Sequence, residues 1–580
     1  MSRKKIDLNT FYQNMAESLN LYNVILKNYS EKISLPPNPE FDPLNINKAF
    51  FESFQKLASD PETMMDSGIG LYQRLSNLWL QSAKEFLTKT PKQIHAEDKD
   101  KRFKDEAWRN SPAFRFLKDA YLTYADWLTQ LAKNVKGLDQ KDKEKLEFYT
   151  SQFIDAVSPS NFVLTNPEVL RATLETNADN LVEGLKKLAD DVKRGAIQQT
   201  DLEAFEIGKN LAITPGKVVF QNDLMQLIQY EPQTKTVHKT PLLFIPAWIN
   251  KYYIVDLRPE NSLAKWLVEQ GHTLFIISWV NPDSKHADKG FADYMHEGIF
   301  AALDQIEKIT GEKKINAIGY CLGGTLLATS LAYMAAKKQD RIKSATFLTT
   351  LLDFSDAGKL SIFIDDEQVK VMEKRMSRTG YLDGSEMATT FAMLRSNDLI
   401  WSFVVNNYLL GRDPFSFDIL YWNSDTTRMP AKMHSFYLRN MYLNNQLAKP
   451  SGITIDNVKI DLSKIKTPAY FLSTIKDHIA PWKSTYKGAH ILKDVNFILA
   501  DSGHIAGVVS PPKKTKYPHW ESNKMPDSAD EWINSAKEVE GSWWPNWGKW
   551  VLKHTGEKVP ARKIKKSIED APGSYVKVKT

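Results

Sequence analysis

The sequence predicts an α/β fold, in which a mostly parallel sheet with helices on both faces follows a mainly helical N-terminal domain. The first observation behind this prediction is that, from about Gly216 onward, short apolar runs alternate with helical stretches. Such alternation is typical of parallel strands joined by crossover helices. The second is that the preceding residues show helical periodicity. We therefore expect a helical domain over residues 1–205 and a catalytic α/β domain over residues 206–580.

Composition excludes several functional classes. The 580 residues carry 42% hydrophobic and 25% charged residues, which is typical of globular proteins. The net charge of +6 is mild, and no basic stripe interleaved with aromatic residues indicates nucleic-acid binding. The apolar runs are shorter than the roughly 20 residues that a membrane span needs, and residues 1–30 lack the apolar core of a signal peptide. We expect a cytoplasmic protein without a transmembrane segment.

The clearest helix of the N-terminal domain opens at Asn166-Pro167, a capping residue and a first-turn proline. Apolar residues then recur at helical spacing until Gly195, which predicts one continuous helix. The proline-rich residues 36–43 and the charged residues 95–104 predict loops or linkers between helices. The apolar residues of the predicted helix are Leu170, Leu174, Leu181, Leu185, Leu188 and Val192.

The catalytic domain shows seven short apolar runs that predict strands. Between them, residues 353–448 interrupt the alternation and are rich in methionine and aromatic residues. We interpret this segment as a cap insertion over the active site, since methionine fills irregular, movable apolar surfaces. An ordinary helical subdomain core explains the composition equally well. The predicted strands are residues 218–220, 242–245, 274–277, 315–318, 345–348, 470–472 and 497–499.

Cys321 is the first candidate catalytic residue. The strand at 315–318 leads into Gly319-Tyr320-Cys321-Leu322-Gly323-Gly324, and a predicted helix follows. This is the nucleophile elbow of α/β hydrolases with cysteine in place of serine. The N-terminus of the following helix is expected to lower the pKa of the thiol. Since Cys321 is the only cysteine, an intrachain disulfide and a zinc-thiolate cluster are excluded, and a reducing compartment is expected.

A cysteine nucleophile needs a base and an orienting carboxylate, in the chain order nucleophile, acid, histidine. Asp477 follows the strand at 470–472, and His504 follows the next strand, at 497–499. This spacing predicts Asp477 as the acid and His504 as the base. His478 is the competing base, although it shares a loop with Asp477. The weaker acid candidates are Asp353 and Asp501.

An oxyanion hole requires two backbone N–H groups. We expect the first from Leu322, directly after the nucleophile. The second is expected from the loop that follows the strand at 242–245, where Ile249 or Trp248 is the candidate, although Trp248 is also explained as a core residue. Farther along the chain, Trp543, Trp544, Trp547 and Trp550 predict core or subunit packing, with product contact as an alternative.

These residues resemble a known family, the class I polyhydroxyalkanoate synthases. The box around Cys321 is similar to the lipase-like box of that family, and further motifs match in the same order along the chain. The resemblance extends from the helical region to Ala571-Pro572-Gly573-Ser574-Tyr575-Val576. The other matching motifs are Ile249-Asn250-Lys251-Tyr252-Tyr253 with Asp256-Leu257, Tyr421-Trp422-Asn423, Asp477-His478-Ile479-Ala480-Pro481-Trp482 and Ser502-Gly503-His504-Ile505-Ala506-Gly507.

The resemblance implies an acyltransferase that polymerises (R)-3-hydroxyacyl-CoA, by default 3-hydroxybutyryl-CoA, and releases CoA through acyl-cysteine intermediates. It implies a triad of Cys321, Asp477 and His504, and places Trp422 in a motif near the cap and the dimer region, with His478 beside the site. Asp477 either orients His504 or activates the attacking hydroxyl. No cofactor or metal is expected, because CoA is part of the substrate.

The resemblance also implies a homodimer whose N-terminal domain takes part in dimerisation and in association with polyhydroxyalkanoate granules, where the growing polyester chain lies. Two other functions are compatible with parts of the pattern. An acyl-CoA thioesterase or another cysteine-type α/β hydrolase would use the same triad with water as the acceptor. A granule-surface structural protein with a relic fold is the other, but the intact Cys–Asp–His order argues against it.

Overall fold

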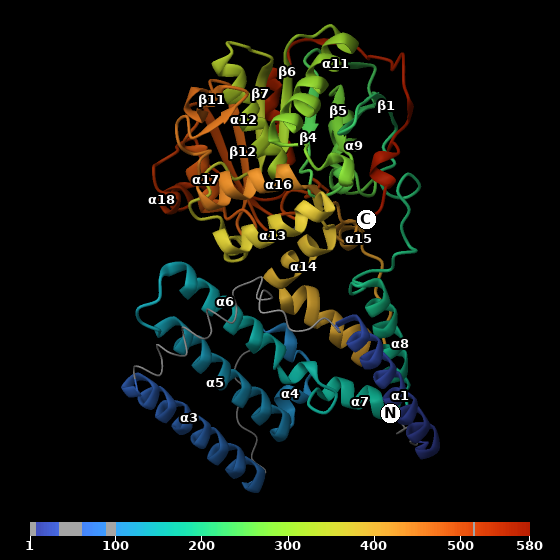
Figure 1. Ribbon diagram of the computed structural model, residues 1–580, viewed down its shortest axis with the longest axis vertical. Coiled ribbons are helices and arrows are strands. Elements are labelled where there is room, and N and C mark those ends of the chain that lie inside the picture. Colours follow the sequence, from blue (N-terminus) through green and yellow to red (C-terminus); the bar gives the residue numbers. More distant parts are fainter. Residues whose placement is uncertain (1–6, 34–60, 89–99, 514–516) are drawn as a thin grey trace. The chain divides into compact units, whose positions relative to one another are not determined.

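The computed structural model describes residues 7–33, 61–88, 100–513 and 517–580, and these form two compact units (Figure 1). The first unit, the helical unit, comprises the chain up to Asp201 together with residues 389–415. The second, the catalytic unit, comprises residues 202–388 and 416–580. The segment that we expected to form one cap insertion is thus divided between the two units.

The helical unit is built from long helices around small apolar clusters. Helix α5 packs against α3 and α6. One apolar cluster consists of Phe103, Trp108 from α4, Tyr121 from α5 and Ile154 from α6. The main helices are α1 (Leu8–Ile33), α3 (Pro61–Thr88), α4 (Ala107–Asn110), α5 (Pro112–Asn134), α6 (Gln140–Ala156), α7 (Pro167–Glu175) and α8 (Asp179–Arg194).

The prediction of one continuous helix between Asn166 and Gly195 is wrong, because the structure has two helices there, α7 and α8. Both predicted ends are confirmed: the Asn166 side chain accepts hydrogen bonds from the first-turn N–H groups, and Gly195 closes α8 at φ 81°. The break lies at Asn177 and Ala178, whose φ values are 53° and 66°. Apolar spacing continues across this break, so periodicity alone does not reveal it. Asn is among the residues that adopt the left-handed conformation most readily.

The two predicted loops of this region fall largely on undescribed residues. Residues 36–43 lie outside the described residues, as do residues 95–99. The described remainder of the second loop forms a short 3₁₀ helix, Lys101–Phe103, which the side chain of Asp100 caps.

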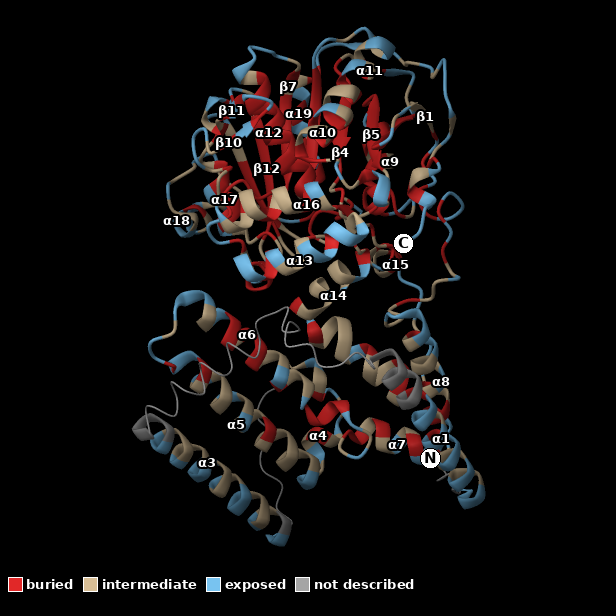
Figure 2. Ribbon diagram, viewed as in Figure 1, coloured by how far each residue is buried: buried red, intermediate tan, exposed pale blue. Residues whose placement is uncertain are grey.

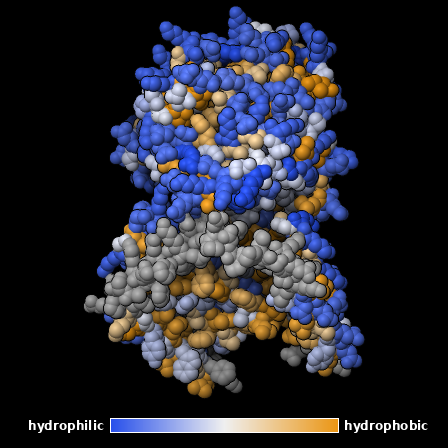
Figure 3. All heavy atoms as spheres, in the orientation of Figure 1, coloured by the Kyte–Doolittle hydropathy of each residue, from blue (hydrophilic) through white to orange (hydrophobic). Residues whose placement is uncertain are grey.

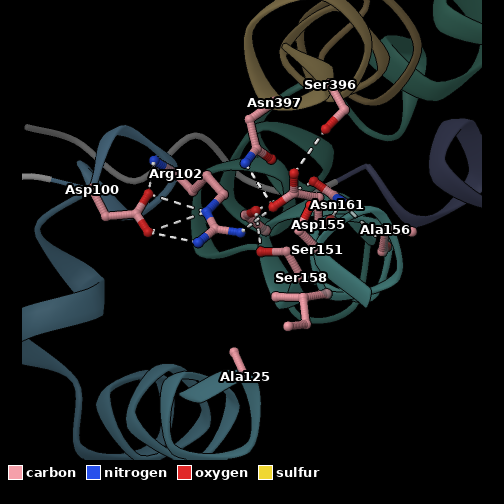
Figure 4. Close-up of polar contacts among 12 residues, drawn as sticks. Asp100, Arg102, Ala125, Ser151, Asp155, Ala156, Ser158, Asn161, Ser396 and Asn397 are labelled. Atoms are coloured by element: carbon pink, nitrogen blue, oxygen red, sulfur yellow. Dashed lines mark hydrogen bonds and ion pairs between the residues drawn. The ribbon is translucent and has the colours of Figure 1, made fainter. Parts of the chain in front are cut away.

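A partly buried polar cluster joins residues 389–415 to the rest of the helical unit (Figure 4). The carboxylate of Asp155 accepts hydrogen bonds from Ser396 Oγ at 2.7 Å and Asn397 Nδ2 at 2.8 Å. Arg102 lies between Asp155, 3.3 Å away, and Asp100, 2.7 Å away. One carboxylate of α6 therefore bonds three side chains from two separate parts of the chain.

The catalytic unit contains an 11-stranded sheet in the order β15-β14-β13-β12-β7-β6-β4-β5-β2-β1-β17. Its centre, from β5 to β13, is parallel, and both edges are antiparallel. All seven predicted strands are confirmed. The strands are β1 (Gly216–Gln221), β2 (Met225–Tyr230), β4 (Leu242–Ile245), β5 (Leu274–Trp279), β6 (Ile315–Tyr320), β7 (Ile342–Leu348), β12 (Ala469–Thr474), β13 (Val495–Ala500), β14 (His519–Glu521), β15 (Lys537–Val539) and β17 (Glu569–Asp570).

Apolar clusters cover both faces of this sheet, and Figure 2 shows its central strands as buried. One face packs against α11 (Ala301–Thr310), α12 (Leu322–Ala336) and α17 (Trp482–Ala489), the other against α9 (Leu263–Glu269) and α19 (Trp544–Val551). Burial on both faces explains why the central strands read as continuous apolar runs. The core role predicted for Trp543, Trp544 and Trp547 is confirmed, since each is at most 3% exposed.

The former cap segment contributes to the main core of the catalytic unit. Its helices are α13 (Asp366–Thr379), α14 (Gly384–Leu394), α15 (Asp418–Ser424) and α16 (Ala431–Tyr437). Met376, Met429, Met433 and Met441 are buried in the same cluster as α12. These methionines therefore have the ordinary core role that composition alone did not distinguish from a movable surface. Among the described residues, no helix is both long and apolar enough to span a membrane.

Candidate active site

Cys321 stands at a sharp turn between β6 and α12. Its backbone has φ 52° and ψ −117°, and its N–H donates to the carbonyl of Leu348 at 2.9 Å. A Cβ atom at Gly319 would lie 2.4 Å from Gly324 Cα, and one at Gly323 would lie 2.1 Å from the carbonyl oxygen of Ile245. No side chain fits at either position. The turn therefore has the backbone geometry of a nucleophile elbow, with the strained positive φ at the cysteine itself.

His504 and Asp477 form a buried pair. His504 Nδ1 lies 2.7 Å from Asp477 Oδ2, and the side chains are 8% and 0% exposed. The other carboxylate oxygen, Oδ1, accepts hydrogen bonds from the N–H groups of Ile479 at 2.8 Å and Ala480 at 2.9 Å. These backbone donors fix the carboxylate, and the carboxylate in turn fixes the orientation and the tautomer of the imidazole.

The charges of this pair and of Cys321 act on one another. Burial alone lowers the pKa of His504, but the Asp477 carboxylate and the Cys321 thiolate, each through charge and a hydrogen bond, outweigh burial and raise that pKa to about 10. The arrangement thus favours the protonated imidazolium form of His504. Cys321 is partly exposed, whereas the side chains of His504 and Asp477 are buried.

The competing candidates have other partners. The Asp353 carboxylate accepts hydrogen bonds from Ser355 N at 2.8 Å and from Asn445 Nδ2 at 3.0 Å. Asp501 forms an ion pair with Lys476 at 2.6 Å. His478 lies in the Asp477 loop and is partly exposed. The carboxylate that bonds His504 is that of Asp477.

Two backbone segments meet at the elbow. Leu322 is the first residue of α12, a position whose N–H has no hydrogen-bond acceptor within the helix. The close approach of Gly323 to Ile245 brings the end of β4, and the loop 246–251 that follows it, against the same turn. Ile249 is partly exposed in this loop. Trp248 is 2% exposed, and its ring contacts Tyr294 at 5.5 Å, which supports its core role.

Aromatic residues that the sequence did not single out surround the pair. The ring of Tyr320 stacks on His504 at 5.7 Å between centroids, and its hydroxyl donates to the carbonyl of His504 at 3.0 Å. Tyr437 and Tyr442 pack against each other at 5.6 Å. Burial chiefly, and also the charge of Cys321, raise the pKa of both phenols. The only sequence feature that pointed to a contact between Tyr320 and the site is its position directly before Cys321.

Trp422 is buried beneath the loop 246–251. Its indole N–H donates to the carbonyl of Lys251 at 2.7 Å, and the side chain belongs to the core on the α9 face of the sheet. No group of three or more His, Cys, Asp or Glu side chains in the described part of the chain could hold a metal ion.

Comparisons with known proteins identify relatives over most of the chain. A sequence profile described as the N-terminus of poly-beta-hydroxybutyrate polymerase (PhaC) matches residues 99–267, and an α/β hydrolase fold profile matches residues 240–511. The poly(3-hydroxyalkanoate) polymerase of Methylorubrum extorquens is 49% identical over 90% of this chain and 88% of its own length. The PhaC subunits of Rhizobium meliloti and Cupriavidus necator are 47% and 44% identical, over 87% and 83% of their lengths and 90% and 83% of this chain.

Solved structures also resemble part of the chain. A monoacylglycerol lipase from Paleococcus ferrophilus is 16% identical, with a TM-score of 0.30, over 48% of this chain and 90% of its own.

Proposed function

Since the chain belongs to the poly(3-hydroxyalkanoate) polymerase family and is therefore an acyltransferase, we propose that it polymerises (R)-3-hydroxyacyl-CoA through acyl intermediates on Cys321. In this proposal His504 is the general base and acid, and Asp477 orients it. The observation that carries the proposal is the buried His504–Asp477 pair. The pKa of its histidine is raised both by Asp477 and by Cys321.

The first half-reaction is a thioester exchange. The Cys321 thiolate attacks the carbonyl carbon of the acyl-CoA, a C–S bond forms to Cys321, and the C–S bond to CoA breaks. The His504 imidazolium donates its proton to the departing CoA thiolate. Cysteine suits this step because the acyl-enzyme is still a thioester, so little acyl-transfer potential is lost.

The second half-reaction forms the ester. The hydroxyl of another 3-hydroxyacyl group attacks the acyl-Cys321 carbonyl, His504 takes the hydroxyl proton, and the cysteine thiolate leaves. General acid–base steps of this kind contribute about 10²–10⁴-fold. The two backbone donors to Asp477 Oδ1 support an orienting role for the carboxylate, because its other oxygen is committed to His504.

The oxyanion of each tetrahedral intermediate needs donors that are already in place. We propose the N–H of Leu322 as the first and that of Ile249 as the second. The position of Leu322 at the start of α12 and the close approach of Gly323 to Ile245 support this assignment.

The substrate, the assembly and the location are part of the same proposal. We propose 3-hydroxybutyryl-CoA as the substrate, no further cofactor, a homodimer as the active form, and a cytoplasmic location at the granule surface. Figure 3 shows apolar residues on the visible face of the helical unit, which supports contact with an apolar surface. Large exposed side chains on α1 and α3 include Leu8, Tyr12, Leu19, Met65, Tyr72, Trp79 and Leu80.

One assay separates the main outcomes. Purified protein is incubated with (R)-3-hydroxybutyryl-CoA, with thiol release, insoluble polymer and free 3-hydroxybutyrate followed together, and with Cys321→Ala as the control. Thiol release with polymer, absent from the control, is the expected result. Release with free acid alone would indicate a thioesterase, and release that persists in Cys321→Ala would remove the cysteine mechanism.

A further inference from the structure

Lys251 is a buried lysine whose ammonium holds two distant parts of the catalytic unit together. It lies two residues after Ile249, is 3% exposed, and its Nζ donates to the carbonyl oxygens of Val576, at 3.0 Å, and Val578. Burial lowers the pKa of Lys251, and the nearby carboxylate of Asp425 acts in the opposite direction. A buried ammonium is costly unless it is bonded, so these contacts are what permits it here.

The same loop is also held from its other side. The Trp422 indole bonds the carbonyl of Lys251 at 2.7 Å, and Asn250 forms an isolated antiparallel bridge with Thr426. Shortly after the loop, the Tyr253 hydroxyl donates a hydrogen bond to the Asp425 carboxylate at 2.9 Å, which is a further contact with residues 421–426. The loop 246–251 therefore lies between residues 421–426 and residues 576–578.

The 576–578 segment is itself anchored. Val576 is 1% exposed in the core, and the hydroxyl of the preceding Tyr575 donates to the carbonyl of Asn222 at 2.7 Å. Asn281 Nδ2 donates to the carbonyl of Val578 at 3.3 Å. Lys251 is thus tied to fixed carbonyl groups, and a fixed Lys251 limits where the adjacent backbone of Ile249 can lie.

We infer that Lys251 is a positioning residue for acyl transfer: through the carbonyls of Val576 and Val578, it holds the loop whose N–H completes the oxyanion hole. This inference rests on the proposed function. An oxyanion donor contributes about 10²–10³ in kcat, and a displacement of about 1 Å can cost about 10². Neither Cys321 nor His504 is a hydrogen-bond partner of Lys251 Nζ, whose acceptors are the carbonyls of Val576 and Val578.

The test is Lys251→Met, which keeps the length of the side chain and removes its donors. We expect kcat for CoA release to fall about 10- to 100-fold while KM changes by less than about threefold. The rate of Cys321 alkylation by iodoacetamide is expected to stay near that of the wild type, because this displacement needs no oxyanion donor. Lys577→Met is the matched control, since Lys577 is exposed in the same segment, and should behave as the wild type.

Wild-type kcat in Lys251→Met would overturn the inference, and so would an equal loss of turnover and of alkylation, which indicates a general loosening of the fold. If Lys251→Met does not fold, Trp422→Phe decides, because it removes the donor to the Lys251 carbonyl. A kcat loss at normal alkylation is then expected, and an unchanged kcat overturns the inference. Turnover that persists in Cys321→Ala would instead refute the proposed function.

Discussion

At the scale of single residues, the candidate site is defined by what surrounds His504 as much as by His504 itself. A carboxylate, an aromatic ring and the elbow cysteine contact it from different directions. Each neighbour acts on a different property of the imidazole: its tautomer, its position and its charge. Substitutions that remove one neighbour at a time therefore have separable effects.

Tyr320→Phe removes the hydroxyl that donates to the His504 carbonyl and keeps the stacked ring. We expect a loss of about 1–3 kcal/mol in the free energy of unfolding, because a buried acceptor loses its donor. Turnover is expected to fall several-fold. Chemical denaturation and CoA release measure the two effects. Tyr320→Leu also removes the ring, and a loss of turnover no larger than that of Tyr320→Phe would argue against the stack as a support for His504.

The pKa of His504 depends on its two anionic neighbours, and the dependence has a definite sign. In Cys321→Ala we expect this pKa to fall yet remain above the ordinary value of about 6.5, because Asp477 is still present. In Asp477→Asn the cysteine contribution alone remains, and a larger fall is expected. An NMR titration of selectively labelled histidine measures both shifts.

The consequence for stability follows from the direction of the shift. Because folding raises the pKa of His504, its stabilising effect is complete below pH about 6.5 and is lost as the pH rises through the folded-state value. A Cys321→Ala variant whose stability depends on pH as strongly as that of the wild type across this alkaline range would contradict the contribution of Cys321 to the pKa of His504.

At the scale of elements, the central strands and the elbow were predictable because each is a local pattern. An apolar run before a glycine-flanked cysteine requires no knowledge of distant residues, and the same holds for the strands that carry Asp477 and His504. The left-handed residues Asn177 and Ala178 and the short strand β14 escaped prediction, since periodicity does not register one or two turned residues or a three-residue strand.

Contacts between distant elements were beyond prediction for a different reason. Lys251 and Val578 are separated by 327 positions, and no local sequence pattern in either segment predicts that they are in contact. The composition of the 353–448 segment likewise did not reveal that residues 389–415 pack with the helical unit. Local sequence specifies what a segment can bury, whereas its partner is decided by the complete fold.

Asp155→Ala tests the cluster that joins residues 389–415 to α6. Three side chains lose their acceptor, so we expect the helical unit to lose about 3 kcal/mol and residues 389–415 to become sensitive to protease. Asp126→Ala is the control, because Asp126 is half exposed and its 2.7 Å ion pair with Arg74 is worth about 0–1 kcal/mol. Equal protease sensitivity in both variants would show that the cluster does not hold this segment.

At the scale of the whole molecule, each unit has its own apolar core, but the cores differ greatly in size. The clusters on both faces of the sheet are extensive, whereas the helical unit buries small clusters such as that of Phe103 and Trp108. Units with separate cores can unfold separately. The unit with less buried apolar surface is expected to unfold first.

We therefore expect calorimetry to show two unfolding transitions, the lower one from the helical unit. Asp155→Ala should lower only the first transition, and Tyr320→Phe only the second, because the residues lie in different units. A single transition that both substitutions shift equally would mean that the two units unfold as one.

The division of the chain between the units also sets an order for biosynthesis. The hydrogen bond from Ser396 to Asp155 cannot form until Ser396 has been synthesised, 241 residues after Asp155. At about 5–20 residues per second, that interval is roughly 10–50 s. The helical unit, although it begins first, cannot be completed until much of the sheet has been translated. A nascent chain arrested before Ser396 would expose an unfinished apolar surface, on which holding chaperones would act.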